Sequence, residues 1–227
     1  MNDRTAAVTS GNPDQGRLRH IGKNVRAKLA ATKGVHKVDV ENAELWLVGD
    51  FLSPAECSRL MQMIDAGARP SPILDAEGLP NFRTSYTTDF HPRDPFIRTI
   101  DRRIDRLLDI KSAFGETVQG QRYLVGQEFK AHEDWFPVAS PHWHRESKRG
   151  GQRSFTAMAF LNPVEAGGET DFPRLAIGIA PLPGMLLIWN NADLDGNPNP
   201  WTLHAGMPVA RGAKYIITKW YRCAPWS

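Results

Sequence analysis

The chain has 227 residues, of which 41% are hydrophobic and 23% are charged, and its formal net charge is +3 at pH 7. These values are typical of a globular domain, and so small a charge predicts no large nucleic-acid-binding surface. Two cysteines cannot form a disulfide framework, and no apolar run approaches the roughly 20 residues of a membrane span, so we expect a cytoplasmic protein with neither nucleic-acid nor membrane partners.

We expect one domain preceded by a polar segment. Residues 1–17 are polar and contain glycine and proline, a composition typical of disordered segments. Residues 18–227 are enough for a single buried core, and no break in composition divides them. Within this domain we expect helices and strands to mix over 18–117 and a strand-rich core to occupy 118–227.

Three helices are predicted in the first half of the chain. A short basic helix is expected over residues 21–32, where apolar residues recur at intervals of four. A second begins after Ser53, because Pro54 suits the first helical position and Glu56 completes a capping box with the serine. A third begins after Asp94 and carries an apolar stripe at helical spacing. The stripe consists of Ile97, Ile100, Ile104 and Leu107.

Strands dominate the rest of the chain. One is expected over 43–51, and another follows the proline-rich loop 69–82. After residue 117, short apolar segments alternate with Gly, Pro and Asn turns. The candidates are 118–125, 128–136, 153–161, 169–173, 176–182, 184–190, 202–209 and 213–222. This density of short strands predicts an α+β fold, with a double-stranded β-helix (jelly roll) core and the N-terminal helices packed on one sheet.

One strand candidate carries side chains that bind metals. Side chains alternate between the two faces of a strand, so His132 and Asp134 share a face and Glu133 lies on the other. Non-haem Fe(II) sites use two histidines and one carboxylate and leave coordination positions open. We expect His204 to supply the second histidine, because a jelly roll can fold its strand back beside the first pair.

The last strand candidate carries a lysine on its inward face. Alternation places Lys214 on the same face as Ile216, Thr218 and Trp220. An ammonium group inside an apolar barrel is costly unless an anion meets it there. A dicarboxylate co-substrate would supply that anion.

Five motifs follow one another between Trp46 and the C-terminus. They are FLSPAEC, FRTS, QRYLVGQEFKAHEDWF, GGQRSFTAMAFLNPVEAGGETDFP and LHAGMPVARGAKYIITKWYR. Together they resemble the prolyl 4-hydroxylase family of Fe(II)- and 2-oxoglutarate-dependent dioxygenases, in its bacterial-type form with a single catalytic domain. The resemblance spans about four-fifths of the chain, which makes it far more specific than a single His-x-Asp triplet.

The resemblance implies an iron enzyme. His132, Asp134 and His204 would bind Fe(II), and Lys214 would pair with the distal carboxylate of 2-oxoglutarate. Glu133 stands between the first two ligands, and the spacing of the ligands is that of the family. Oxidative decarboxylation of 2-oxoglutarate by O2 to succinate and CO2 would accompany hydroxylation of an unactivated C–H bond. Ascorbate is expected to keep the iron reduced.

Further pocket residues are implied in the same way. Tyr123 and Thr170 would donate hydrogen bonds to the distal carboxylate, and Trp220 would line the same pocket. Both Tyr123 and Thr170 are also ordinary strand residues that would simply fill a barrel. Arg83 falls where the family has an arginine facing the prolyl substrate, although an ion pair with Asp89 is an equal alternative.

A rival metal set lies in residues 140–147, SPHWHRES. His142 and His144 are two positions apart there, and Glu146 is in phase with them. A proline precedes these residues and a basic, glycine-containing stretch follows them, so we expect a mobile loop rather than a strand. In that loop Trp143 would stack on a substrate.

The substrate stays open at this point. The leading hypothesis is a prolyl residue in a peptide or protein, and the alternatives are free proline, another amino acid or a small molecule. A non-catalytic binding module on the same fold is a second alternative. The loops 69–82 and 140–147 would form a groove for an extended peptide or close over a small molecule, and the sequence gives no indication of oligomeric state.

Overall fold

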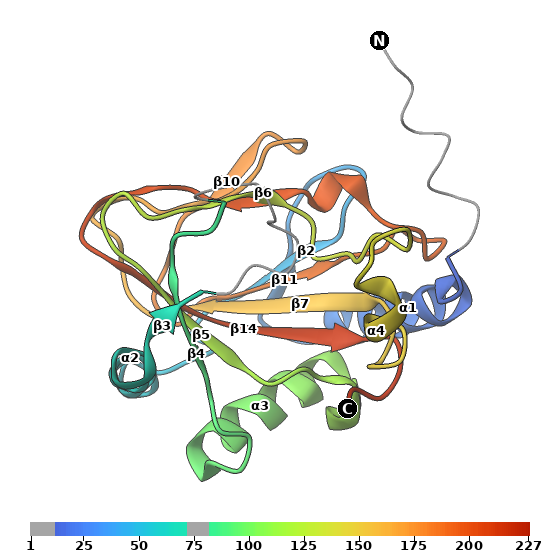
Figure 1. Ribbon diagram of the computed structural model, residues 1–227, viewed down its shortest axis with the longest axis horizontal. Helices are drawn as coiled ribbons and strands as arrows, with labels where there is room; N and C mark the ends of the chain where they lie inside the picture. Colours follow the sequence, from blue (N-terminus) through green and yellow to red (C-terminus); the bar gives the residue numbers. More distant parts are fainter. Residues whose placement is uncertain (1–11, 72–81) are drawn as a thin grey trace.

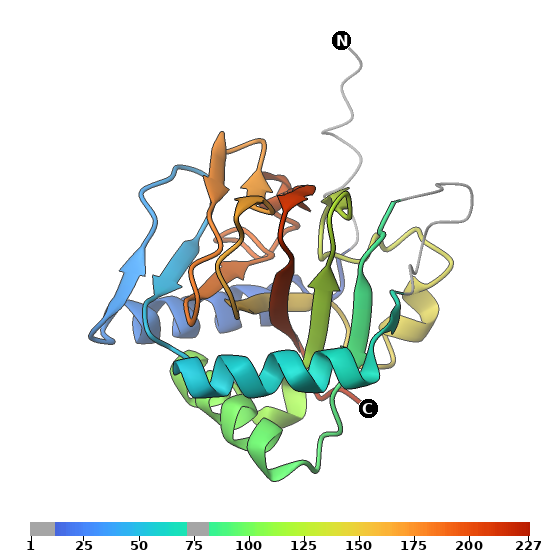
Figure 2. The ribbon, with the colours of Figure 1, turned by 90° about the vertical axis from the view of Figure 1, so that its left-hand side faces the viewer.

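The computed structural model describes residues 12–71 and 82–227 (Figure 1). Two antiparallel sheets lie face to face, and helices cover the outer face of the larger sheet (Figure 2). This is the predicted α+β fold with a jelly-roll core. Most of the segment expected to be disordered and most of the proline-rich loop, residues 1–11 and 72–81, lie outside the described part of the chain.

The three predicted helices are present. Their bounds are α1 Gln15–Ala30, α2 Pro54–Gly67 and α3 Pro95–Leu108, and the short helical segments are η1 Ser112–Phe114, α4 Trp143–Glu146 and η2 Pro200–Thr202. The capping box of α2 forms as predicted: Ser53 Oγ accepts the Glu56 N–H at 3.3 Å, and the Glu56 carboxylate accepts the Ser53 N–H at 2.8 Å. Asp94 caps α3 by accepting two backbone N–H groups of the first turn. Of the described helices, none has the length and apolar content needed to cross a membrane.

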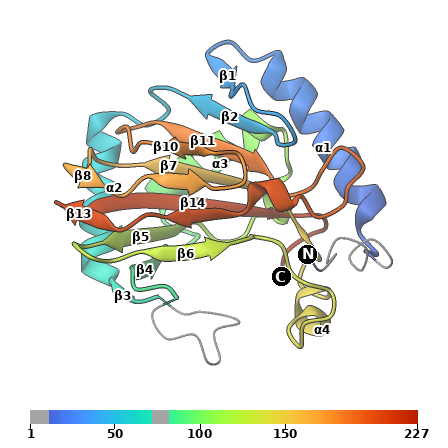
Figure 3. The ribbon, with the colours of Figure 1, turned by 90° about the horizontal axis from the view of Figure 1, so that it is seen from above.

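The first helix begins earlier than predicted. α1 starts at Gln15 rather than at residue 21, so its first turn occupies the end of the segment that we expected to be disordered. Leu18 in this turn is buried against Ala192 and Cys223, and the helix lies beside β1 at the end of the larger sheet (Figure 3). These partners come from the far end of the chain, so local composition did not reveal them.

The strands form one large sheet, one small sheet and a separate pair. The large sheet has the order β1-β2-β11-β7-β14-β5-β4-β3, with β1 Val35–Lys37, β2 Leu45–Val48, β3 Arg69–Pro70, β4 Tyr86–Asp89, β5 Gln119–Tyr123, β7 Arg153–Phe160, β11 Leu186–Asn190 and β14 Lys214–Arg222. The small sheet has the order β10-β9-β12-β6, with β6 Phe129–His132, β9 Thr170–Phe172, β10 Ile177–Ile179 and β12 His204–Gly206. The pair is β8 Ala166–Gly167 with β13 Val209–Arg211.

The large sheet separates two hydrophobic cores, because its side chains alternate between its two faces. On β11, Leu186 and Ile188 belong to the core under the helices, whereas Leu187 and Trp189 belong to the core between the sheets. The helices close the first core with Leu29, Leu60, Ile64, Ile97, Ile100 and Ile104. The second core surrounds the inward polar side chains of both sheets, and there the predicted site residues meet.

Candidate metal centre

His132, Asp134 and His204 come together between the two sheets. β12 pairs with β6 so that His204 lies opposite His132, and the two ring centroids are 4.3 Å apart. Asp134 Oδ2 lies 4.0 Å from His204 Nε2. One ligand atom from each residue lies within 4.8 Å of the others, and no second group of this kind occurs among the described residues. Two histidines and one carboxylate in such a cluster are a donor set that suits Fe(II).

The backbone reaches this arrangement differently from the prediction. β6 ends at His132, and Asp134 lies in a bend rather than in a strand. The bend still turns the Asp134 carboxylate inward, where it is buried. Glu133 points outward and lies 3.6 Å from Arg174 in an exposed ion pair. The predicted division of the two carboxylates therefore holds.

Both imidazoles present the same nitrogen to the cluster. His132 Nδ1 lies 2.8 Å from the Lys130 carbonyl oxygen, and His204 Nδ1 lies 2.9 Å from that of Thr202. When Nδ1–H donates to a carbonyl, the Nε2 lone pair is left for a metal. Burial, and then the neighbouring His204, lower the pKa of His132 to about 3. The ring is therefore neutral, which is the form that binds metals.

The carboxylate of Asp134 is oriented from two sides. Thr156 Oγ1 donates to Asp134 Oδ2 at 2.7 Å and in turn accepts from Asn191 Nδ2 at 3.0 Å. Arg153 Nη1 lies 3.6 Å from Asp134 Oδ1. Burial alone would raise the pKa of Asp134, but the electrostatic interactions with the neighbouring His204 and Arg153 outweigh burial and lower it. The carboxylate is therefore ionised at neutral pH.

Lys214 lies at the other end of the same cavity. It begins β14 opposite Tyr123 of β5, is 2% exposed, and donates to Thr170 Oγ1 at 3.3 Å. In the described part of the chain it forms no ion pair with a carboxylate. Burial lowers the pKa of Lys214 to about 7, and the charge of Glu169 offsets part of that effect. A buried amine with one neutral hydrogen-bond partner is suited to an anionic ligand.

One cavity touches every residue that the sequence assigned to metal or co-substrate. These residues are His132, Asp134, His204, Lys214, Tyr123, Thr170 and Trp220. Apolar side chains such as Phe129 and Met158 line the cavity between them. The Phe129 ring stacks on His132 at 3.6 Å between centroids, and Trp189 meets His204 edge-on at 4.8 Å. The aromatic rings therefore fix the histidines and keep that wall of the cavity apolar.

Arg83 lies beside this cavity and does not pair with Asp89. Its Nε donates to Ser85 Oγ at 3.1 Å, and its guanidinium carbon lies 4.8 Å from the centre of the Phe129 ring. Asp89 instead forms its ion pair with Arg69. Burial lowers the pKa of Arg83. The predicted alternative of an Arg83–Asp89 ion pair is therefore wrong. Arg83 instead places a cationic side chain next to the metal cluster.

The segment 140–147 corrects a second expectation. It contains the short helix α4 where we expected a mobile loop. Glu146 is buried and accepts hydrogen bonds from Arg222 at 2.6 Å and from Arg145 at 2.9 Å, so it cannot join the rival metal set.

His142 and His144 belong to no metal-binding group within the described ranges. Trp143 is not among the residues that line the cavity.

Sequence reasoning missed several polar side chains that support the site, and four of them lie on or beside the strands of the large sheet. They are Glu116, Gln121, Arg153 and Thr156. Thr156 shares the inward face of β7 with Met158, so strand alternation offered a signal for it. The pairing of Arg153 with Glu116 gave no such signal, because it joins two segments 37 residues apart.

Known proteins resemble this chain in sequence and in structure. A profile of the 2OG-Fe(II) oxygenase superfamily matches residues 118–222. The putative prolyl 4-hydroxylase of Acanthamoeba polyphaga mimivirus is 29% identical over 178 residues, which are 78% of this chain and 73% of that protein. Probable prolyl 4-hydroxylase 3 of Arabidopsis thaliana is 31% identical over an alignment of 195 positions, which covers 75% of this chain and 66% of the plant protein. About a third of the plant protein thus has no counterpart in the match.

Solved structures of prolyl hydroxylases are also similar to this chain. The viral collagen prolyl hydroxylase of Paramecium bursaria Chlorella virus-1, solved as a 2OG complex, is 31% identical, with a TM-score of 0.60 over 83% of this chain and 95% of that one. A Pseudomonas putida prolyl-4-hydroxylase is 18% identical, with a TM-score of 0.56 over 90% of this chain and 98% of that one. The second likeness concerns the fold alone.

Proposed function

The chain belongs to the 2OG-Fe(II) oxygenase superfamily and is of the prolyl 4-hydroxylase type, and on that premise we propose that it hydroxylates prolyl residues in a peptide or protein. Fe(II) is the metal of this superfamily, and 2-oxoglutarate and O2 are its co-substrates. The observation that carries the proposal is a single cavity with a metal-binding cluster at one end and, at the other, a buried amine that forms no ion pair with a carboxylate of the described chain.

We assign the metal and the co-substrate to the two ends of this cavity. His132, Asp134 and His204 would hold Fe(II), because both histidines keep Nε2 available and the carboxylate is ionised. Lys214 would bind the distal carboxylate of 2-oxoglutarate, since no carboxylate of the described chain neutralises it. A metal-binding cluster and a buried ammonium in one cavity suit a molecule that carries an acid group at each end.

The remaining predicted residues take supporting roles in the proposal. Tyr123 and Thr170 flank Lys214, where their hydroxyl groups would donate hydrogen bonds to the same carboxylate. Trp220 would line the pocket from β14. Arg83 would contact the substrate, because it lies next to the metal cluster and forms no ion pair with Asp89.

The bound groups and the chain divide the chemistry between them. Iron and 2-oxoglutarate supply the activation of O2 and the oxidation of the C–H bond, with release of succinate and CO2. The chain orients both groups and excludes water. Phe129 and Trp189 limit access to the histidines, and the apolar wall keeps the cavity at low polarity.

Two further parts of the proposal have their own support. Ascorbate would act as the reductant, because iron that is oxidised without hydroxylating a substrate has to be reduced before the next turnover. A cytoplasmic location would suit Cys57 and Cys223, which are both buried free thiols.

The test measures succinate formed from 2-oxoglutarate by the Fe(II)-loaded protein in the presence of O2 and ascorbate. A proline-rich peptide, free proline and no substrate are compared. Turnover stimulated by the peptide and lost in His204→Ala supports the proposal. Stimulation by free proline alone would replace the peptide with a small molecule. Absence of 2-oxoglutarate consumption and of binding would overturn the assignment as an enzyme.

A further inference from the structure

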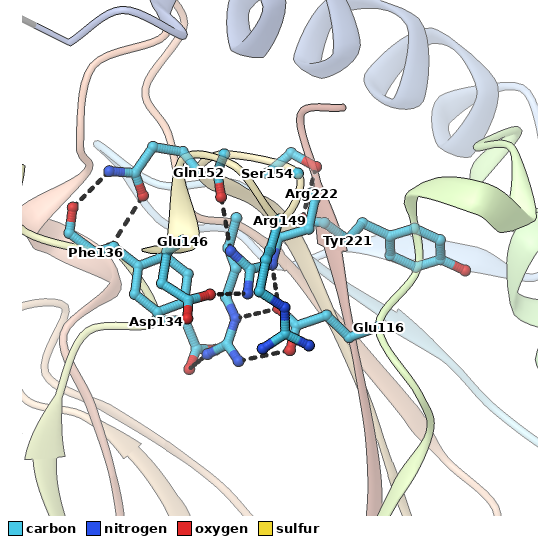
Figure 4. Close-up of polar contacts among 12 residues, drawn as sticks. Glu116, Asp134, Phe136, Glu146, Arg149, Gln152, Ser154, Tyr221 and Arg222 are labelled. Carbon is cyan, nitrogen blue, oxygen red and sulfur yellow. Dashed lines mark hydrogen bonds and ion pairs between the residues drawn. The ribbon is translucent and has the colours of Figure 1, made fainter. Parts of the chain in front are cut away.

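A buried chain of alternating charges runs from Asp134 to α4. Arg153 Nη1 lies 3.6 Å from Asp134 Oδ1, while Nε and Nη2 of the same guanidinium donate to both oxygens of Glu116 at 2.7 and 2.9 Å. Glu116 also accepts from Arg222 Nε at 2.5 Å, and Arg222 donates to Glu146 at 2.6 Å (Figure 4). The five side chains are between 3 and 13% exposed.

Arg153 contacts its two carboxylate neighbours in different ways. Toward Glu116 it makes two short, parallel hydrogen bonds, which is the strongest geometry available to a guanidinium. Toward Asp134 the separation of 3.6 Å exceeds hydrogen-bond length, so only the attraction between the charges remains. Trp220 and Phe136 cover the guanidinium at 4.2 and 4.9 Å from its carbon to the ring centres. The plane of the group is thus held by Glu116 and two rings.

The alternative pairing would interfere with a metal. A guanidinium that turned to Asp134 would form the same two-bond pair there and would engage both carboxylate oxygens. Thr156 already donates to one of them. A carboxylate bound in this way offers few lone pairs to a cation.

We infer that Glu116 is a positioning residue, which holds the Arg153 guanidinium close enough to balance the charge of Asp134 but too far to hydrogen-bond it. The Asp134 oxygens then stay available to the metal. This inference rests on the proposed function, because it takes Asp134 as a metal ligand. Glu116 also binds Arg222, but Arg153 is the residue that links it to Asp134, so its effect on metal binding should depend on Arg153.

The test compares the affinity for Co(II), whose visible absorption reports binding in place of Fe(II), among four proteins. They are the wild type, Glu116→Gln, the double variant Glu116→Gln/Arg153→Met and the control Glu44→Gln. Glu44 matches Glu116, because it is 9% exposed and receives two guanidinium nitrogens from Arg26, yet it lies outside the cavity. Glu116→Gln should weaken Co(II) binding about 10- to 100-fold, the usual effect of losing a side chain that orients a ligand.

Adding Arg153→Met should recover most of that loss, and Glu44→Gln should change nothing. A double variant as weak as Glu116→Gln overturns the inference, and so does an unchanged affinity in Glu116→Gln. Absence of Co(II) binding by the wild type would instead overturn the proposed function and the inference with it. Thermal unfolding reports whether each variant folds. If Glu116→Gln does not, Glu116→Asp replaces it, with the shorter carboxylate expected to release Arg153 and weaken Co(II) binding in the same direction.

Discussion

β14 buries two lysines on its two faces, and their surroundings are opposite. Lys219 is 1% exposed and binds Asp101 and Asp105 of α3 in the core under the helices. Tyr221 adds a hydrogen bond to Asp105 at 2.7 Å. Lys214 is 2% exposed on the cavity side, where it donates a hydrogen bond to the neutral hydroxyl of Thr170.

The difference separates a structural cation from a ligand-binding one. Lys219 is neutralised by the chain itself, so nothing further is needed to keep it buried. Lys214 loses its hydration without forming an ion pair to any carboxylate among residues 12–71 and 82–227, and burial lowers its pKa to about 7. A cost of this kind persists in a fold when it serves binding, and an incoming carboxylate would remove it. The pair of lysines therefore provides an internal control for the proposed co-substrate site.

The largest expected effect is on folding. Lys219→Met leaves two carboxylates of α3 without their cation, and breaking a buried pair in this way costs about 3 to 5 kcal/mol. Urea unfolding would measure the loss in the free energy of unfolding, with Lys111→Met, an exposed lysine, as the control. A loss under about 1 kcal/mol, the range of exposed ion pairs, would show that the aspartates do not depend on Lys219.

The next effect is on binding. Lys214→Met should weaken 2-oxoglutarate binding to the metal-loaded protein by about 2 to 5 kcal/mol, which is roughly 30- to 5000-fold, because the distal carboxylate would enter an apolar pocket unpaired. The free energy of unfolding without ligand should stay equal or rise. Calorimetric titration measures the first quantity and urea unfolding the second. Exposed Lys130→Met serves as the control, and equal affinities in all three proteins would contradict the comparison.

A smaller effect concerns pH. The pKa of Lys214 is about 7 in the folded chain, against an ordinary value near 10.5. Between these values the unfolded state binds more protons, so this lysine should make the free energy of unfolding rise with pH, by at most about 1.4 kcal/mol per pH unit. Stability from this source is lost as pH falls toward 7. Urea unfolding at pH 7.5, 8.5 and 9.5 should show a steeper rise in the wild type than in Lys214→Met, and parallel curves would rule the low pKa out.

The smallest effect comes from Thr170. Thr170→Val removes the hydroxyl that accepts from Lys214, in a side chain of similar shape. One neutral hydrogen bond contributes about 0.5 to 1.5 kcal/mol, so 2-oxoglutarate should bind roughly 2- to 13-fold more weakly. The same titration measures this change. A loss as large as that of Lys214→Met would mean that Thr170 positions more than one group in the pocket.

Local signals in the sequence predicted much of this structure. The capping box at Ser53 and the cap at Asp94 located two helices, since such signals depend on neighbouring residues. Strand alternation correctly placed Lys214 inward, because a side-chain period of two needs no knowledge of the partner strands. Strand alternation also gave the correct direction for Asp134. The backbone bends at this residue instead of continuing as a strand, but the bend turns the carboxylate inward, where it is buried.

Long-range contacts explain where the predictions were wrong. α1 begins at Gln15 because Leu18 packs against residues from the far end of the chain. The segment 140–147 is ordered because Glu146 meets Arg222, which lies 76 positions away. Pairing across such distances depends on which loops close, and local composition carries no record of that.

The sequence by itself determined the chemistry that is available. It supplied two histidines and a carboxylate with strand spacing, an inward lysine and the order of the motifs, because these depend on residue identity and on short-range periodicity. The tertiary structure alone decided which charges are neutralised. Strand alternation puts Lys214 and Lys219 on opposite faces but does not say which of them meets a carboxylate, and Arg153 could pair with either of two carboxylates. Which carboxylate each of these cations meets depends on the elements that pack against its strand, since the electrostatic energy of a buried charge depends on its neighbours in space.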